Sequence, residues 1–393
     1  MTRKTFMILI RTVALVILIL VLAPNLVRFI NQPLREQMTI GYSTDTVRAN
    51  VDTVIEEGVL TLGEVDQAYQ ILYVTVTDGD YAGQSFTIDY GTRQIRNDMI
   101  PLQVGDDIMI TISSRPDGTL SAFFADYYRG RSLLVLVITF VAFGIIVSGW
   151  KGVRSLIGIA LSLVVIIVII LPGIQQGKDP LVTSIFGSFF FVSYSLYIVY
   201  GWNMKTHAAV VGSLLALIIT GILAFIFVDQ SRLTGYGNEN MFYISQITQN
   251  TLNVRHLLLA GILIGTLGVL DDLVISQSSA VFELYRNNPA QNFQSLYRSA
   301  MNIGKDHIAA TVNTLVLAYA GAALPMLLLF SYRSVDFLMA INLEFIAEEI
   351  VRTLVGSLGL FAAVPITTSL AALIAIKYRD LGDLKTYLGP LNE

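Results

Sequence analysis

The chain has 393 residues, of which 54% are hydrophobic and 14% are charged, whereas roughly a quarter of the residues in an ordinary globular chain are charged. It contains no cysteine, which excludes disulfide bonds, thiolate metal sites and cysteine nucleophiles. The net charge of −4 indicates no particular partner, and no nucleic-acid partner is expected. The composition predicts that most of the chain lies in a lipid bilayer.

The first apolar run, residues 12–27, follows three basic residues, as the core of a secretory signal peptide does. No small-x-small cleavage site follows it, and Pro24 lies where the cut would fall. We therefore predict an uncleaved N-terminal transmembrane anchor over residues 1–30.

Residues 31–130 differ sharply from the anchor and predict a small all-β domain. Short stretches rich in β-branched and aromatic residues are separated by turn signals, and they cover residues 47–56, 70–77, 84–90, 107–113 and 119–124. About five strands in this length indicate a barrel or a sandwich, with the oligonucleotide-binding (OB) type as one candidate. Such a fold does not by itself specify a ligand.

The rest of the chain consists mainly of apolar runs close to the ~20 residues that a spanning helix needs. They cover residues 132–150, 156–172, 180–200, 208–228, 257 to about 284, 308–330 and 353–376. With the anchor, these runs predict eight transmembrane helices. The expected fold is a polytopic α-helical membrane protein with an extracytoplasmic β domain, a seven-helix transmembrane domain over residues 131–378 and a tail over residues 379–393.

The basic residues indicate the orientation. With the N-terminus inside, twelve Lys and Arg residues flank the cytoplasmic ends of the predicted spans and five lie in the opposite short loops, as the positive-inside rule requires. Both termini are therefore expected in the cytoplasm, with residues 31–130 outside the plasma membrane. The long connector of residues 229–256 contains a mixed apolar and polar stretch, residues 241–247, which predicts a short amphipathic piece on the outer membrane surface.

Ionisable groups at membrane depth are costly and are functional candidates by default. At 100° per residue, one helical stripe of roughly 80° in the sixth span contains Gly261, Gly265, Gly268, Asp272, Ser276, Ser279 and Glu283. Asp271 lies about 100° from Asp272. We interpret the stripe as facing the bundle interior, with Asp272 as its main candidate; the alternative is that both aspartates mark the cytoplasmic end of a shorter span.

Polar residues on the last two spans lie at a similar depth, so that three consecutive helices place polar groups at one level. A carboxylate there could take up and release a proton, or bind a cation together with hydroxyl and amide oxygens. The predicted proton or ion pathway consists of Asp272, Asp271, Ser276, Ser279, Glu283, Asn313, Thr314, Thr367 and Thr368. Near the outer end of the eighth span, Glu348 and Arg352 are spaced as a helix-surface ion pair.

Enzyme signatures are absent from the sequence. The three histidines, at positions 207, 256 and 307, are too far apart for a His-x-x-x-His zinc helix, and no phosphate loop or nucleophile elbow is present. We expect no enzymatic activity, no cofactor and no metal centre.

Two stretches resemble the YibE/YibF-like family of bacterial membrane proteins. One is Gly265-x-x-Gly268-x-x-x-Asp272-x-x-x-Ser276-x-x-Ser279-x-x-x-Glu283, and the other is residues 302–315, NIGKDHIAATVNTL. The order of anchor, outer domain and helical bundle also resembles YibE. The resemblance implies a shorter YibF-like sister membrane protein as a partner, with a homo-oligomer as the alternative. The usual family form has an apolar residue immediately before the aspartate of the first motif, which is Asp272 here, whereas this chain has Asp271 at that position.

A more distant likeness concerns SecD and SecF of the resistance-nodulation-division (RND) permease superfamily. It rests on a Gly-rich run into an intramembrane aspartate, the pair Phe282-Glu283 and the pair Asn313-Thr314 on the next helix. In that superfamily intramembrane carboxylates relay protons, and the likeness implies this role for Asp272.

Two functional hypotheses remain open. In the first, the chain is a permease or export component coupled to proton or cation movement through an intramembrane carboxylate. In the second, it is a non-transporting envelope scaffold whose β domain binds a partner, and the polar stripe serves helix packing alone.

Overall fold

The computed structural model describes residues 43–62, 65–92, 99–114, 119–238, 240–249, 251–332, 336–378 and 384–391. The predicted anchor over residues 12–27 lies outside the described residues. The described residues divide into two compact units, which meet between Ile146 and Val147, and each is described by itself.

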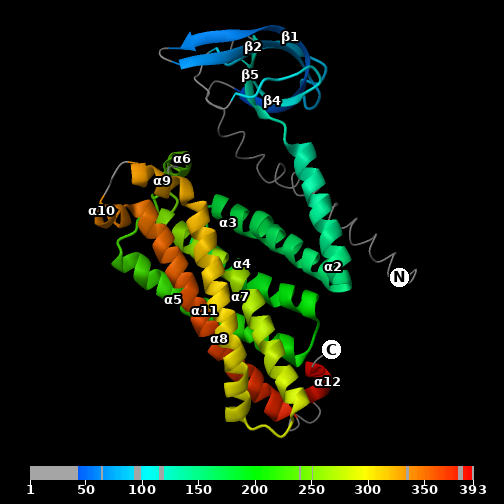
Figure 1. Cartoon of the computed structure of the whole chain (residues 1–393), viewed down its shortest axis with the longest axis vertical. Helices are drawn as coiled ribbons and strands as arrows, with labels where there is room; N and C mark the ends of the chain where they lie inside the picture. The colour runs from blue at the N-terminus through cyan, green and yellow to red at the C-terminus, as the bar shows by residue number, and fades with distance from the viewer. Residues whose placement is uncertain are drawn as a thin grey trace, which may run out of the picture. The chain divides into compact units, whose positions relative to one another are not determined.

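The first unit contains a five-stranded antiparallel sheet (Figure 1). Its strands run in the order β3-β2-β1-β4-β5, with β1 Ser43–Leu62, β2 Val65–Val76, β3 Ser85–Tyr90, β4 Asp107–Ser114 and β5 Leu120–Tyr127. The prediction of a small all-β domain is therefore confirmed as a half-barrel sheet. Closure of the OB type stays a prediction.

Alternation of apolar and polar residues creates the core of this sheet, because successive side chains of a strand point to opposite faces. Along β4, Ile108, Ile110 and Ile112 are buried, and residues from the other strands pack against them. The two edge strands approach each other at an aromatic cluster, in which the hydroxyls of Tyr90 on β3 and Tyr127 on β5 are hydrogen-bonded. The sheet is therefore curved, with its two edge strands near each other at this cluster.

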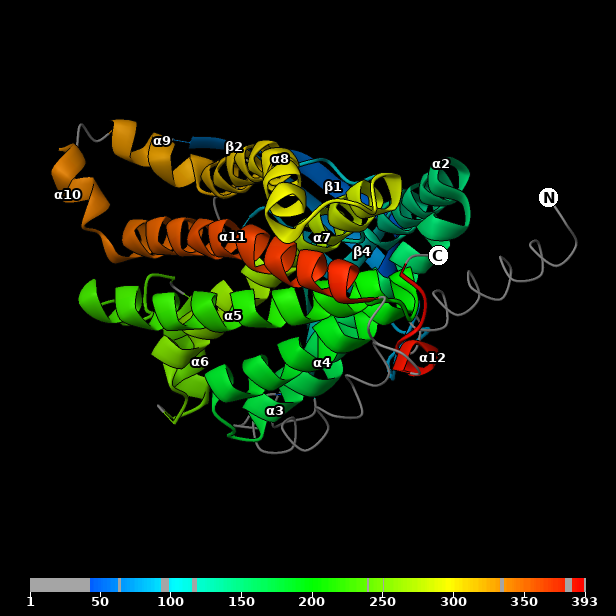
Figure 2. The same ribbon diagram turned by 90° about the horizontal axis from the view of Figure 1, so that it is seen from below.

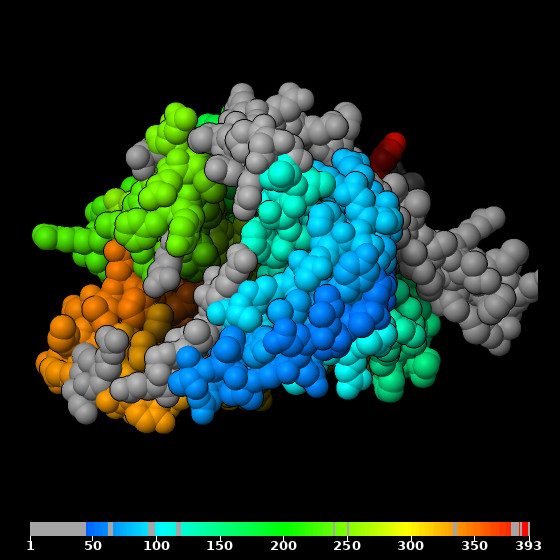
Figure 3. All heavy atoms as spheres, turned by 90° about the horizontal axis from the view of Figure 1, so that it is seen from above, coloured from blue at the N-terminus to red at the C-terminus, as the bar shows by residue number. Residues whose placement is uncertain are grey.

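Beyond the core, β1 and β2 continue as a two-stranded ribbon. β4 pairs with Ser43–Asn50 of β1 and β3 pairs with Gln70–Thr75 of β2, whereas β1 and β2 stay paired as far as Leu62 and Val65. Figure 3 shows these two strands, in blue, as an elongated ridge on the surface of their unit. Ile55 and Val59 are exposed on the ribbon.

Long helices make up most of the second unit (Figures 1 and 2), and the first of them, α2, begins within the first unit. The helices are α2 Gly130–Val164, the π-helix η1 Val165–Ile170, α3 Leu171–Gln175, α4 Pro180–Tyr200, α5 Met204–Gln230, α6 Asn240–Ile247, α7 Val254–Asn287, α8 Phe293–Ala322, α9 Leu324–Tyr332, α10 Phe337–Ile341, α11 Glu344–Lys377 and α12 Leu384–Leu388. The amphipathic piece predicted within residues 229–256 is helix α6.

Five helical stretches in the described residues are long and apolar enough to cross a membrane, and a sixth is added if α8 and α9, bent by 59°, form one span. The predicted count of eight is therefore not confirmed. The expected spans at 132–150 and 156–172 fall within one continuous stretch, Gly130–Gln175. This stretch contains one non-helical residue, Gly149, with φ 55° and ψ −133°, a conformation that favours glycine.

Helix α11 lies at the centre of the bundle, between α5 and α8 in Figure 2, and it also packs against α7. Glycine on one helix faces a threonine on the next, and such small residues let helix backbones approach closely. Three such pairs line the contacts of α11 with α5 and α7: Gly212 with Thr367, Gly359 with Thr220, and Gly356 with Thr266.

Candidate functional site

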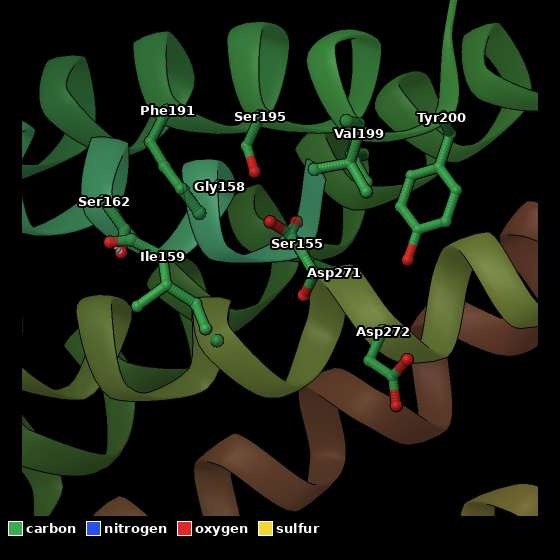
Figure 4. A pocket seen from close by; sticks show the side chains of 12 residues that line it. Ser155, Gly158, Ile159, Ser162, Phe191, Ser195, Val199, Tyr200, Asp271 and Asp272 are labelled. Carbon is green, nitrogen blue, oxygen red and sulfur yellow. Dashed lines mark hydrogen bonds between the residues drawn. The ribbon is translucent and has the colours of Figure 1, made fainter. Parts of the chain in front are cut away.

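A polar cavity of about 280 Å³ opens among α2, α4 and α7 (Figure 4). Its lining combines two carboxylates, several hydroxyls and apolar side chains, and consists of Ser155, Gly158, Ile159, Ser162, Phe191, Ser195, Leu196, Val199, Tyr200, Gly268, Asp271 and Asp272. All these residues belong to the helical unit. We call this cavity the Asp271 pocket.

The pocket reaches into the bundle from one of its ends. Ser213, which contacts Asp271, is nine residues after the start of α5 at Met204, or about 14 Å along the helix axis. Tyr200 is the last residue of α4. The pocket therefore extends from the end of the bundle at which α4 ends and α5 begins to Asp271, roughly two and a half helical turns inside.

Asp271 is the carboxylate that points into the pocket. The Oγ of Ser213 on α5 donates a hydrogen bond to Oδ1 of Asp271 at 3.2 Å. Figure 4 shows the Ser195 hydroxyl on α4 pointing toward Asp271, whereas the side chain of Asp272 points in a different direction. The structure thus brings a carboxylate together with hydroxyls from two other helices.

The interpretation of the glycine stripe on α7 requires correction. Gly261, Gly268, Asp272 and Glu283 are exposed on the single chain, and Gly265, Ser276 and Ser279 are partly buried. The buried face of α7 is set by large apolar side chains, such as Leu263, Leu270 and Val274, which pack in the main core. Within lipid, van der Waals packing of such bulky side chains fixes how a helix is rotated. Gly261 and Gly268 have open space beside them, whereas Gly265 faces Tyr319 of α8.

A row of serines on α4, which was not predicted from the sequence, leads toward the pocket. Ser184, Ser188 and Ser195 share one face of α4, within about 40° at 100° per residue. All three are buried, and within the described residues the hydroxyls of Ser184 and Ser188 have no hydrogen-bond partner. Their helical spacing within an apolar run is the signal that sequence reasoning had available.

A π-helix follows the pocket-lining part of α2. Residues Val165–Ile170 form η1, immediately after Ser155, Gly158 and Ser162. Single π-helical turns within α-helices occur frequently at functional sites. The irregular backbone therefore agrees with a functional role for the adjoining pocket.

Thr367 and Thr368 on α11 are fully buried but lie apart from the pocket lining. Nε2 of Gln277 on α7 donates to Oγ1 of Thr368 at 2.7 Å and to the carbonyl of Ala300 on α8 at 3.0 Å. Gln277 was missed because it lies between Ser276 and Ser278, off the predicted stripe. These contacts join three helices and serve packing.

The remaining predicted pathway residues point away from the pocket. Asn313 and Thr314 are exposed on α8, and the Thr314 hydroxyl donates to the carbonyl of Ala310 on its own helix. Glu283 is paired with Arg286 at 2.6 Å on the exposed face of α7. The polar residues that the sequence placed at one depth on three consecutive helices thus do not form a single site in this chain.

The predicted pair of Glu348 and Arg352 also requires correction. Arg352 Nη1 lies 3.4 Å from Oε1 of Glu349, while Oε1 of Glu348 accepts the backbone N–H of Gly237 at 3.1 Å. Glu344, one turn earlier, accepts the N–H of Gly235 at 3.0 Å. Backbone N–H groups of the connector between α5 and α6 need hydrogen-bond acceptors. The carboxylates of Glu344 and Glu348 accept from them and are therefore not paired with Arg352.

The donor set of the pocket consists of oxygen atoms. In the part of the chain that the structure describes, no group of three or more His, Cys, Asp and Glu residues is placed to hold a metal ion. Lys and Arg are not among the lining residues. The arrangement suits a proton or a hard cation, which binds carboxylate and hydroxyl oxygen.

The long apolar helices and the separate β sheet define a helical membrane protein that carries a small β domain. The sequence model of the YibE/F-like protein family matches residues 136–377, and the chain belongs to this family. Neither a curated protein nor a solved structure matches the chain. The likeness to SecD and SecF stays a resemblance of short motifs.

Proposed function

We propose that the protein is a membrane permease or export component in which the Asp271 pocket takes part in proton or cation movement. The observation that carries this proposal is a carboxylate directed into a pocket of mixed polar and apolar lining between apolar helices, without a basic residue in the lining. Such intramembrane carboxylates mark ion pathways and proton relays in membrane proteins. Asp271 takes the role that the sequence pattern had suggested for Asp272.

Helix packing is a weak reason for this arrangement. Hydrogen bonds between helices in membranes contribute about 0.6 kcal/mol on average, whereas a charged side chain at the helix centre costs roughly 2.5–3.5 kcal/mol or more. The cavity of about 280 Å³ also exceeds by several-fold the ~30 Å³ that one water molecule occupies in the liquid. A solvated carboxylate can exchange ions, which a packed one cannot.

The serine row on α4 supplies a route to the pocket. Ser184 and Ser188 lie between the start of α4 at Pro180 and the pocket residue Ser195. Hydroxyl groups both donate and accept hydrogen bonds, so a row of them can guide a proton or replace part of the water shell of a cation. The proposed pathway runs along this face of α4 to Asp271.

The alternative is an envelope scaffold without transport. The exposed apolar residues on the β1–β2 ribbon, Ile55 at 55% and Val59 at 68% exposure, favour a protein partner for the β domain. The polar face of α7 and α8, with Asp272 and Asn313, is also exposed on the single chain. A sister chain or a second copy of this chain would cover it within the membrane.

Ion flux into liposomes that contain the purified full chain decides between the two functions. Under an imposed pH gradient and membrane potential, the transporter predicts uptake of protons or alkali cations above that of protein-free liposomes. Ser188→Val should slow this uptake, whereas Ser193→Val should not, because the Ser193 hydroxyl is bonded to the carbonyl of Phe189 on its own helix and lies outside the pocket lining. If liposomes that contain the folded protein take up ions no faster than protein-free liposomes, the result would favour the scaffold.

A further inference from the structure

Oxygen atoms alone provide the polar lining of the Asp271 pocket. They come from the carboxylates of Asp271 and Asp272 and from the hydroxyls of Ser155, Ser162, Ser195 and Tyr200. Nitrogen and sulfur ligands select zinc, copper and nickel, whereas oxygen ligands select hard cations. The ligand types therefore exclude a transition-metal site of the usual kind and fit an alkali or alkaline-earth ion.

Ser195 points to a ligand independently of the carboxylate. The residue is 8% exposed, and its hydroxyl, unlike those of Ser184 and Ser188, is not enclosed by packing but faces the pocket. A hydroxyl that faces a pocket can donate and accept hydrogen bonds with what occupies it. Because the Ser195 hydroxyl points toward Asp271 across the cavity (Figure 4), a bound ion between them would satisfy both groups.

The charge of the lining favours a monovalent ion. Of the two carboxylates, Asp271 points toward the hydroxyls and Asp272 points in a different direction. One negative charge balances one positive charge, whereas Ca²⁺ sites usually supply several carboxylates and Mg²⁺ retains much of its water. Nζ of Lys205 lies 5.9 Å from the centroid of the Tyr200 ring and is not part of the lining, so it does not replace the ion.

A proton alone leaves part of the site unexplained. Protonation neutralises Asp271, which already has Ser213 as one hydrogen-bond partner, but it does not require hydroxyls from α2 and α4. A dehydrated cation needs several oxygen ligands to replace its water shell. Ser155, Ser195 and Tyr200 provide such oxygens from two helices.

We propose that the Asp271 pocket binds a dehydrated alkali cation, sodium or potassium, between the Asp271 carboxylate and the hydroxyls of Ser195, Ser155 and Tyr200. This inference rests on the proposed transport function and names the class of its coupling ion. Sites for such ions in transporters are built within the membrane from oxygen atoms of neighbouring helices.

Equilibrium binding of radioactive sodium, and of radioactive rubidium as the potassium analogue, to the purified full chain tests the proposal at constant ionic strength. We expect saturable binding of one of these ions, displaced by its own chloride salt but not by choline chloride. Ser195→Ala should weaken the binding and Asp271→Asn should abolish it. The matched control Ser193→Ala changes a serine of the same helix that does not line the pocket, and it should bind as the wild type does.

The results separate this inference from the proposed function. Proton flux that depends on Asp271, without saturable binding of either ion, would overturn the alkali-cation site and leave the transport proposal standing. Binding that is equal in Ser195→Ala and the wild type would also overturn the site. Since Ser195→Ala removes one hydroxyl from a cavity wall and should fold, it provides a test even if Asp271→Asn does not fold.

Discussion

The buried side chain of Gln277 holds three helices together by hydrogen bonds. It is 1% exposed and its amide links α7 to α8 and α11. Gln277→Ala should destabilise the bundle by about 1–2 kcal/mol, because it removes two inter-helix hydrogen bonds and leaves a cavity. Unfolding of the full chain in mixed detergent micelles measures this change. Ser276→Ala, on the partly buried face, is the control; equal effects of both substitutions would refute the structural role.

The ion pair of Arg48 and Asp107 joins β1 to β4 and gives the sheet a pH dependence. The Arg48 guanidinium donates to Asp107 at 2.6 Å, and this hydrogen bond lowers the pKa of Asp107 below its ordinary value. The stabilisation is fully present above the ordinary carboxyl pKa of about 3.9 and is lost as the pH falls through the lowered pKa.

We expect Asp107→Asn to weaken the sheet at neutral pH and to remove this acid dependence. Hydrogen exchange of the amides of β1 and β4, corrected for intrinsic rates, follows the change in the full chain. Asp126→Asn affects a pair that is 57% exposed on both sides and should have a smaller effect. An unchanged acid dependence in Asp107→Asn would show that another group is responsible.

The choice between Asp271 and Asp272 shows how far the residues of the site could be predicted. The sequence indicated that a carboxylate of this pair lies at membrane depth. The glycine stripe favoured Asp272, but Leu263, Leu270 and Val274 fix the buried face of α7, and this rotation turns Asp271 toward α4 and α5. Side-chain volume on the facing helices decides the rotation, and a single sequence does not contain that information.

At the scale of the element, Asp179 fixes the start of α4. Its Oδ1 accepts the N–H of Val182 at 3.0 Å as an N-cap, and its other oxygen contacts the ring of His256 on α7. Partial burial raises the pKa of Asp179, but the Val182 N–H and the His256 ring outweigh it, so its pKa lies below the ordinary value. The charged form is therefore stabilised, and this contribution is lost as the pH falls through the lowered pKa.

Asp179→Ala should cost about 1 kcal/mol for the lost cap, and it also removes the contact with His256. Asp179→Asn retains a capping oxygen without the charge, so it should lose less stability at neutral pH and show no acid transition from this site. Detergent unfolding of both variants across the acid range measures the difference. If the two variants were equally stable at neutral pH, the cap would contribute nothing.

The glycine–threonine contacts of α11 lead to a packing prediction. A side chain at Gly212 would collide with Thr367, whereas one at Gly221 on the same helix would make an ordinary contact, at 3.5 Å from Leu263. Gly212→Ala should therefore lose about 1–3 kcal/mol through overpacking, and Gly221→Ala should be neutral or stabilising. Adding Thr367→Ala to Gly212→Ala should restore stability. Failure of this rescue in an unfolding titration would contradict the close packing of α5 against α11.

Strands and long helices were the most predictable elements, since their periodicity depends on local sequence. The five predicted β segments overlap β1 to β5, although the length of the β1–β2 ribbon was underestimated because its exposed end lacks an apolar alternation. The bend between α8 and α9 was not predicted, because residues 308–330 were read as one span. The local signal for it is Pro325, the second residue of α9, since proline lacks the backbone N–H of a helix interior and favours the first turn of a new helix.

For the whole molecule, the stretch Gly130–Gln175 determines the topology. Its 46 residues would extend about 69 Å as one straight helix, more than twice the ~30 Å hydrocarbon core. The break at Gly149 divides it into two segments that could each cross once, as the sequence pattern predicts. If the stretch crosses the membrane twice, the loop at Lys178 lies on the same side as the β domain. If it crosses once, the loop lies on the opposite side.

Because the chain lacks cysteine, single cysteines can report this topology. With two crossings, Asp80→Cys in the β domain and Lys178→Cys should both react with an impermeant maleimide added outside intact cells. Asn288→Cys, between α7 and α8, should react only after permeabilisation. If the Asp80→Cys variant were labelled from outside and the Lys178→Cys variant were not, the stretch would cross the membrane only once.

The central claim is that ions move by way of the Asp271 carboxylate. The most direct test is ion flux into liposomes containing the purified full chain with Asp271→Asn, beside Asp306→Asn, which changes an exposed carboxylate on α8. The account predicts that Asp271→Asn abolishes flux while Asp306→Asn retains it, with both proteins folded. Equal flux through the two variants would contradict the account.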